Sequence, residues 1–210
     1  MGTPLQRHLD DLFSIYRPTN GAETFYCLGR LLARVITDEI TVAEVGIGHN
    51  PIHLDNIKSG VDHETNSEKK VKLIGIDPNN IPPPHIEFRK GKAQELPLEF
   101  GEVKIVICYD LLKHMDGKFP SWELALQKLC EEAMRVSPEF LIFSDPNLYF
   151  KLRKMSGKGD DYAFICSRLS PCYTEIGLQK YVEKSFSGRF GPPHRWSFFE
   201  KVNGYDSNLK

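Results

Sequence analysis

The sequence predicts an α/β protein with a doubly wound, mostly parallel seven-stranded sheet, a C-terminal antiparallel hairpin and two N-terminal helices. Two observations support this fold class. Short apolar runs alternate along the chain with stretches of helical periodicity, as they do in parallel sheets. Near the end, Gly188, Gly191 and Pro192-Pro193 separate short aromatic stretches, which is typical of a hairpin.

The composition fits one globular domain over residues 1–210, because 40% of the residues are hydrophobic and can bury a core. The net charge of -1 gives no overall field that would attract nucleic acid or a membrane surface. The N-terminus lacks an apolar signal core, and no stretch approaches the ~20 apolar residues of a membrane span. We expect a cytoplasmic protein without membrane contact.

The cysteines indicate reduced thiols inside a cell. Their number is odd, and no C-x-x-C pair occurs, which argues against a disulfide framework or a structural zinc site. The five are Cys27, Cys108, Cys130, Cys166 and Cys172.

Two amphipathic helices are predicted before the first strand, over residues 5–16 and 22–36. They form either a packing layer or a lid over a ligand cleft. Strand 41–46 follows, and a helix then starts with Asn50 as N-cap and Pro51 at its first position. We expect this helix to end near Gly60 and an exposed polar loop to follow.

The central part of the chain supplies further strands and one helix. The prolines at 82–84 forbid an ordinary helix between two of these strands. The helix starts after a Ser121 cap and turns Leu124, Leu129, Ala133 and Val136 inward. The expected ranges are loop 61–70, strands 71–77, 86–89, 103–109 and 140–145, and helix 121–136.

The pattern loosens through residues 147–172, which are rich in Lys, Arg, Gly and aromatic residues. A helix is predicted at 174–185, with Ile176, Leu178 and Tyr181 on its apolar side. The hairpin then spans residues 186–202.

In a doubly wound sheet, ligands bind at the carboxyl ends of the strands. Gly46 and Gly48 follow the first strand and allow a close approach of the backbone to a ligand, although a tight turn alone also needs glycine. Asp77 ends the second strand, where a carboxylate can accept both hydroxyl protons of an adenosine ribose. Together they indicate a nucleoside site.

Two nucleoside cofactors compete for this site. A nicotinamide dinucleotide usually needs G-x-G-x-x-G, and Pro51 stands at the third glycine position without an amide hydrogen for a pyrophosphate. S-adenosylmethionine has no phosphate. Glu44 can stabilise its ammonium group, and the amides at the helix start suit its carboxylate. We therefore favour S-adenosylmethionine.

At this point the sequence resembles the class I S-adenosylmethionine-dependent methyltransferases, which have a Rossmann-like fold, over roughly residues 40–202. The resemblance lies in several motifs in the family's order. They are Glu44-Val45-Gly46-Ile47-Gly48, Gly75-Ile76-Asp77, 91–97, 106–114, 132–142 and 173–186.

The resemblance implies an S-adenosylmethionine site and a division of the chain into functional segments. The implied cofactor contacts are Glu44, Gly46, Gly48, Asn50, Asp77, Ala93, Gln94 and Tyr109, with Ala93 and Gln94 at the adenine. The segments are a helical extension (1–40), a cofactor-binding core (41–145), a substrate lid or insertion (146–172), and a last helix with the hairpin (173–202).

Two departures from the family pattern leave an alternative open. Asn50 stands where the family has a third glycine or small residue, and the proline run at 82–84 removes the usual helix. That alternative is a catalytically silent methyltransferase-like binding or scaffold protein. A nicotinamide-dependent oxidoreductase is a separate, third hypothesis.

Residues at the ends of the fourth and fifth strands are candidates for catalysis. Asp110, His114, Tyr109 and Asp145 are predicted to face the methyl acceptor, and His114 or Asp145 could take its proton. Ordinary cap or turn roles would explain the same residues. His49 and His53 are four apart, but no third ligand is evident, so no metal is expected.

The methyl acceptor is not identified by the sequence and could be a small molecule, RNA or protein. Lys151, Arg153 and Lys154 lie near aromatic residues and could grip a nucleic acid or another anion. A solvated lid would have the same composition. We expect a monomer or a weak homo-oligomer.

Overall fold

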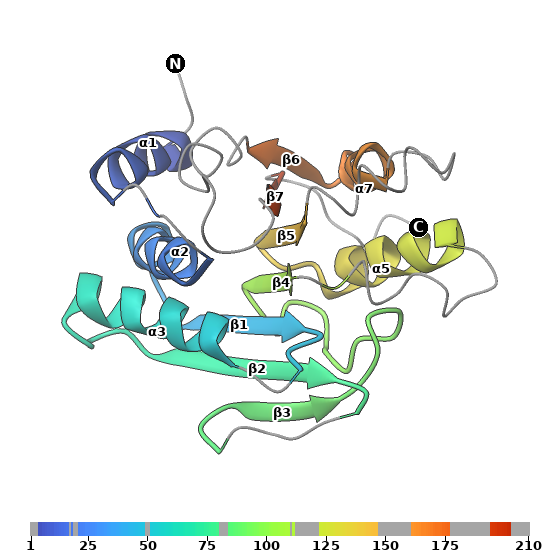
Figure 1. Ribbon diagram of the computed structural model, residues 1–210, viewed down its shortest axis with the longest axis horizontal. Coiled ribbons are helices and arrows are strands. Elements are labelled where there is room, and N and C mark those ends of the chain that lie inside the picture. The colour runs from blue at the N-terminus through green and yellow to red at the C-terminus, as the bar shows by residue number, and fades with distance from the viewer. Residues whose placement is uncertain are drawn as a thin grey trace.

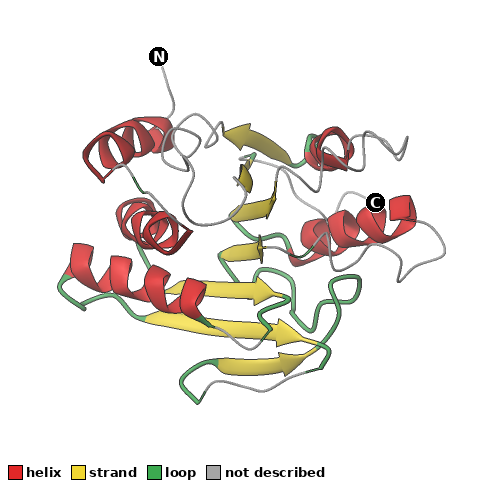
Figure 2. Ribbon diagram, in the orientation of Figure 1, coloured by secondary structure: helices red, strands yellow, loops and turns green. Residues whose placement is uncertain are grey.

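The structure is a computed structural model that describes residues 4–16, 18, 21–48, 51–79, 84–109, 111, 122–146, 161–176 and 194–202. Its N-terminal helices are α1 (Pro4–Tyr16) and α2 (Gly21–Val35), as the apolar periodicity predicts. Both bury their apolar sides, so they form a packing layer. Figure 1 and Figure 2 show the arrangement of the helices and strands.

A mixed seven-stranded sheet forms the centre, in the order β3-β2-β1-β4-β5-β7-β6. The first five strands in sequence pair in parallel, and β7 pairs antiparallel with both β5 and β6. The strand order reverses between β1 and β4. The strands are β1 (Ile40–Val45), β2 (Val71–Asp77), β3 (Glu87–Lys90), β4 (Ile105–Tyr109), β5 (Phe140–Pro146), β6 (Tyr173–Ile176) and β7 (His194–Lys201).

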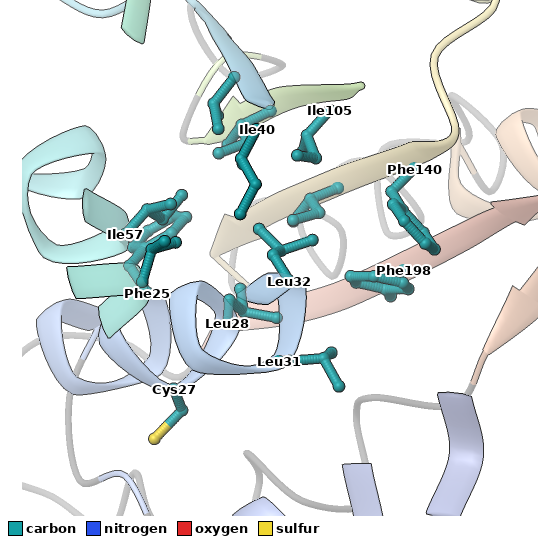
Figure 3. Packing of buried hydrophobic residues seen from close by; sticks show 14 of the residues in the cluster. Phe25, Cys27, Leu28, Leu31, Leu32, Ile40, Ile57, Ile105, Phe140 and Phe198 are labelled. Atoms are coloured by element: carbon teal, nitrogen blue, oxygen red, sulfur yellow. The ribbon is translucent and has the colours of Figure 1, made fainter. Parts of the chain in front are cut away.

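Helices cover both faces of the sheet, which confirms the doubly wound arrangement. Helices α1, α2 and α3 (Ile52–Thr65) pack on one face, and α5 (Trp122–Val136) and α7 (Asp161–Leu169) pack on the other. Each face has its own hydrophobic core: the first core lies under α1, α2 and α3, and the second lies under α5 and α7. The side chains of β1 alternate between them, because Ile40 and Val42 belong to the first core and Ala43 and Val45 to the second. Figure 3 shows Leu28 and Leu32 of α2 within the first core.

Helices α2 and α3 approach each other backbone to backbone. A Cβ built on Gly29 would lie 2.1 Å from the Ile57 carbonyl oxygen, and one on Gly60 would lie 2.1 Å from that of Tyr26. Glycine at both positions therefore permits the crossing. Beside it, Glu64 of α3 accepts hydrogen bonds from Arg30 and Arg34 of α2.

The structure corrects the prediction for the segment after the first strand. Helix α3 continues to Thr65 rather than ending near Gly60, so residues 61–65 of the predicted loop are helical. The helix ends instead where Asn66 adopts a left-handed conformation with φ +50°. Its N-cap is Pro51, and no side chain caps it, whereas Asn50 lies outside the described residues.

Three predictions near the second core are also wrong. Leu124 is exposed, although Leu129, Ala133 and Val136 are buried as predicted. Helix α7 forms within a segment where no element was expected. Residues 174–176, predicted to start a helix, belong to β6 because they pair with β7, which places the antiparallel edge at 173–176. Residues 177–193, including most of the predicted helix and the hairpin turn, lie outside the described residues.

The remaining strands match their predicted ranges closely. Strand β4 begins at Ile105 rather than Val103, and β3 covers residues 87–90. Strands β2 and β3 are parallel neighbours joined by residues 78–86, of which 80–83 lie outside the described part of the chain. The described residues of this connection, 78–79 and 84–86, contain no helix, whereas Pro82 and Pro83 of the proline run lie outside the described part.

Candidate functional site

The site is built around the turn that leaves β1. Gly46 and Gly48 have φ angles of +78° and +60°, in the left-handed region that residues with a Cβ rarely adopt. The Gly46 amide donates to the carbonyl of Ile76 on β2, at 2.7 Å, so the turn stays against the sheet. The positive φ expected at these glycines is therefore confirmed, while their contact with a ligand stays a prediction.

Asp77 binds this turn to the carboxyl end of β2. The Gly48 amide donates to Asp77 Oδ2 at 3.2 Å, and the Asn79 amide donates to Oδ1 at 2.8 Å. Each carboxylate oxygen has a further lone pair and can accept a second hydrogen bond. Asp77 and Gly48 are thus adjacent, as the nucleoside-site hypothesis requires.

The space beside Gly48 is not filled by neighbouring protein atoms. A Cβ built on Gly48 would have no heavy atom within 4 Å, whereas one on Gly46 would lie 2.9 Å from Leu111 Cδ1. Leu111, just after β4, therefore closes one side of the turn. The other side leaves room for a ligand to approach the backbone.

A second turn, at Ala93 and Gln94, lies near the end of β2. Gly91 donates from its amide to the Asp77 carbonyl, and the Glu95 amide closes the turn on the Lys92 carbonyl. This places the predicted adenine-contacting residues on a segment that is bonded to Asp77.

Helix α5 fixes the far side of the same segment. Glu132 accepts the Leu96 amide at 2.7 Å, and the Arg135 guanidinium donates to the carbonyls of Leu96 and Leu98. Arg135 also holds the pKa of the Glu132 carboxyl below its ordinary value, so the acceptor stays ionised. The turn at Ala93 and Gln94 is therefore held at both ends.

Glu44 lies beneath the glycine turn, on the α2–α3 face of the sheet. Its exposed fraction is 1%, and its Oε1 is 2.8 Å from Nδ1 of His53 on α3. The second oxygen, Oε2, is buried and has no hydrogen-bond partner among the described residues. Burial raises the pKa of the Glu44 carboxyl, and the hydrogen bond from His53 opposes that rise.

Aromatic rings surround this pair. The His53 ring lies 4.6 Å from that of Phe25 on α2 and 4.2 Å from that of Tyr109 at the end of β4, measured between centroids. The Trp196 ring of β7 lies 5.3 Å from Phe25 and 5.9 Å from Tyr109. Residues of α2, α3, β4 and β7 thus form one aromatic layer, in which Phe25 and Trp196 are fully buried.

No protein-family model matches the sequence, and no curated protein matches it. Solved structures do match. A loganic acid methyltransferase with SAH has a TM-score of 0.56 and 9% identity, over 91% of this chain and 95% of that one. A class I S-adenosylmethionine-dependent methyltransferase described as putative, from Listeria monocytogenes, has a TM-score of 0.56 and 11% identity, over 93% and 63%.

A third structure, described as a putative sarcosine dimethylglycine methyltransferase from Galdieria sulphuraria, has a TM-score of 0.50 and 13% identity, over 84% of each chain. At these identities the likeness is one of fold. The chain has the class I methyltransferase fold. The resemblance seen in the sequence motifs is therefore confirmed at the level of the fold.

Within this methyltransferase fold, the carboxyl ends of β1, β2 and β4 bring together five of the predicted cofactor residues. Gly46 and Gly48 form the turn, and Asp77 accepts a hydrogen bond from it. Glu44 lies buried beneath the turn and is bonded to His53, whose ring contacts that of Tyr109. Their contacts with a cofactor stay predictions.

The other predicted site residues are not all described. Ala93 and Gln94 join the site through Gly91. Asn50, Asp110 and His114 lie outside the described residues, as do Lys151, Arg153 and Lys154. Asp145 belongs to β5, where its backbone pairs with Arg195, but the side chain is not described.

Sequence reasoning missed His53 as a member of this site. The spacing in the sequence suggests for it only a metal pairing with His49, which lies outside the described residues. The available signal was its place in the first turn of the helix that follows Glu44. Within the described part of the chain, no group of three or more His, Cys, Asp or Glu side chains could hold a metal ion. In that same part, every helix is too short or too polar to cross a membrane.

Proposed function

We propose that the protein binds S-adenosylmethionine at the Gly46–Gly48 turn and transfers its methyl group to an acceptor. The observation that carries this proposal is the hydrogen bond from the Gly48 amide to Asp77, which joins the carboxyl ends of β1 and β2 next to the point where the strand order reverses. In open α/β sheets this is the place where ligands bind. The fold shared with solved methyltransferases supports the choice of cofactor.

The residues present fit this cofactor. Gly48 leaves open space for a nucleoside, and the remaining lone pairs of the Asp77 carboxylate suit ribose hydroxyls. The turn at Ala93 and Gln94 is bonded to Asp77 through Gly91, so these two residues could contact the adenine of the cofactor. The Glu44 carboxylate lies buried beneath the turn, where its negative charge would complement the ammonium group of the cofactor through space.

The bound cofactor would supply an electrophilic methyl group. The chain's own contribution is to hold the nucleoside through Gly48 and Asp77, to orient the acceptor and to exclude water. Tyr109 and Leu111 lie where β4 ends and can form the wall between the two ligands. The acceptor, whether a small molecule, RNA or protein, is to be found by screening.

Calorimetric titration with S-adenosylhomocysteine tests the proposal. Binding to the wild-type protein should be lost or weakened about tenfold or more in Asp77→Ala, because a hydrogen bond to a charged group contributes about 1.5–3 kcal/mol. The matched control is Asp38→Ala. Asp38 is an exposed acid just before β1, at the opposite end of the sheet.

The two variants separate the possible outcomes. Equal weakening in Asp77→Ala and Asp38→Ala would contradict the assignment of Asp77. Absence of binding to the wild type would contradict the proposal and favour a silent relative of the methyltransferases. Binding of NADH in place of S-adenosylhomocysteine would favour a nicotinamide enzyme.

A further inference from the structure

Glu44 and His53 form a buried acid–imidazole pair. The glycine turn does not need this pair to hold its shape. The Glu44 side chain is almost fully buried, and one of its oxygens has no hydrogen-bond partner among the described residues. Leaving such an atom unpaired costs about 1–3 kcal/mol or more. Carboxylates held under this cost, with a titratable partner beside a ligand crevice, are typical of functional sites.

The surroundings of His53 fix the orientation of its ring. Nδ1 is bound to Glu44, and the ring lies against Phe25 on one element and Tyr109 on another. With Glu44 ionised, Nδ1–H donates to Oε1 and Nε2 keeps its lone pair. The His53 side chain remains 19% exposed, while Glu44 is closed off. The pair therefore has one buried end and one accessible end.

His53 lies at the carboxyl end of the sheet, beside the last residue of β4. His53 follows the glycine turn on α3 and contacts Tyr109, the last residue of β4, across the point where the strand order reverses. The amino end of α2 also reaches this point, because a Cβ built on Gly21 would lie 3.3 Å from the Tyr109 hydroxyl. Residues of α2, α3 and β4 thus meet at the imidazole of His53.

We propose that His53 is the base that takes the proton from the methyl acceptor, with Glu44 as the residue that positions it. This inference rests on the proposed methyl transfer. It assigns the acceptor to compounds whose attacking oxygen or nitrogen carries a proton, as in a phenol or an amine, rather than to carboxylates. A carboxylate acceptor is already deprotonated and needs no base.

In the proposed transfer the acceptor gains the methyl group and loses a proton. A lone pair of the acceptor atom forms the bond to the methyl carbon, and the electron pair of the broken carbon–sulfur bond stays on sulfur. The proton leaving the acceptor passes to Nε2 of His53. The resulting imidazolium is stabilised by the Glu44 carboxylate and then releases the proton to water.

The tautomer of His53 provides a test that needs no acceptor. Long-range nitrogen–proton NMR correlations on the wild-type protein, assigned with His53→Gln, should show the Nδ1–H tautomer with a bare Nε2. Two titratable side chains lie against His53: Glu44 of β1, which is bonded to Nδ1, and Tyr109 of β4, whose ring faces the imidazole. An Nε2–H tautomer at neutral pH would overturn the proposal.

Diethyl pyrocarbonate, which acylates unprotonated imidazole nitrogens, measures the reactivity of the same atom. In Glu44→Gln the amide can donate to Nδ1, which moves the proton to Nε2, so we expect most of the His53 modification to be lost. His85 is the internal control, because it is an exposed histidine paired with Asp55. Equal His53 modification in wild type and Glu44→Gln would overturn the role of Glu44.

Turnover with an acceptor from the screen completes the test. We expect His53→Gln to lower kcat by about 10²–10⁴-fold, the usual contribution of a general base, with affinity for S-adenosylhomocysteine unchanged. His85→Gln should leave both quantities unchanged. Unaltered kcat in His53→Gln would overturn this inference while leaving the proposed function standing, whereas absent S-adenosylhomocysteine binding in the wild type would contradict the proposed function itself.

Discussion

Gly48 and Gly101 are two glycines with a left-handed backbone, and comparing them separates an effect on stability from an effect on ligand binding. Both have positive φ, +60° and +68°, and neither would bring a new Cβ within 4 Å of another heavy atom. Gly48 belongs to the turn bonded to Asp77, whereas Gly101 precedes β4 and donates to the Val136 carbonyl. The two positions therefore share a left-handed backbone conformation, which glycine adopts without strain, but only Gly48 belongs to the site.

Replacing each glycine by alanine tests whether the space beside Gly48 is a ligand site. Both variants should lose about 1–2 kcal/mol of unfolding free energy, the cost of a left-handed residue with a Cβ. Only Gly48→Ala should also weaken S-adenosylhomocysteine binding, because its methyl group occupies the open space. Urea unfolding and calorimetry measure the two quantities. Equal affinities in the two variants would contradict a ligand at Gly48.

At the scale of elements, the α2–α3 crossing sets the position of the aromatic layer. Helix α2 carries Phe25 and helix α3 carries His53, and their rings meet because Gly29 and Gly60 let the two backbones approach closely. The ion pairs of Glu64 with Arg30 and Arg34 support the crossing. The geometry of the Glu44–His53 pair thus depends on the packing of the two helices.

The variant Gly60→Ala should be destabilised although alanine favours a helix. The added Cβ would gain about 1 kcal/mol of helix propensity, but overpacking against the Tyr26 carbonyl costs more, about 2–3 kcal/mol. A net loss of about 1–2 kcal/mol corresponds to a fall in Tm of roughly 2–8 °C. Ser59→Ala, one residue away on the exposed side of α3, is the control. A higher Tm for Gly60→Ala would contradict the close crossing.

At the scale of the whole molecule, a charge network connects the β3 edge to the segment before β4. Arg89 of β3 donates to the Pro97 carbonyl and to the Glu102 carboxylate, and Lys72 of β2 pairs with Glu87. The hydrogen bond from Arg89 lowers the pKa of Glu102 to about 2 from its ordinary value of 4.5. Folding therefore stabilises the ionised form of Glu102.

This shift has a defined effect on acid stability. Because the folded-state pKa is depressed, the contribution of Glu102 is fully present above its ordinary pKa of 4.5 and is lost as the pH falls toward about 2. Arg89→Met should lower the unfolding free energy by about 1–2 kcal/mol near neutral pH. The gap from the wild type should close as the pH falls through that range.

Urea unfolding at several pH values measures this gap. Lys90→Met is the matched control, because Lys90 is exposed on the same strand. A gap between Arg89→Met and the wild type that stays constant from neutral to acidic pH would contradict the coupling between Arg89 and Glu102.

Local signals predicted most of the elements, and non-local contacts explain the errors. The strand from Val71 to Asp77 was predicted residue for residue, because a short buried strand is an uninterrupted apolar run. Gly60 resembles a helix end in the sequence, but it lies inside α3 and permits the close contact with Tyr26 of α2. This contact is not visible in the sequence because the two residues are far apart along the chain. Residues 174–176 have helical spacing, but pairing with β7 makes them a strand.

Periodicity and backbone freedom are enough to predict the order of the strands along the chain, the glycine turn after β1 and the acid at the end of β2. Both are properties of neighbouring residues. That Asp77 binds Gly48 and that Glu44 meets His53 beneath the turn follows from the three-dimensional packing alone. Those contacts depend on strand order and on how closely two helices approach, and both are set by packing across the whole molecule.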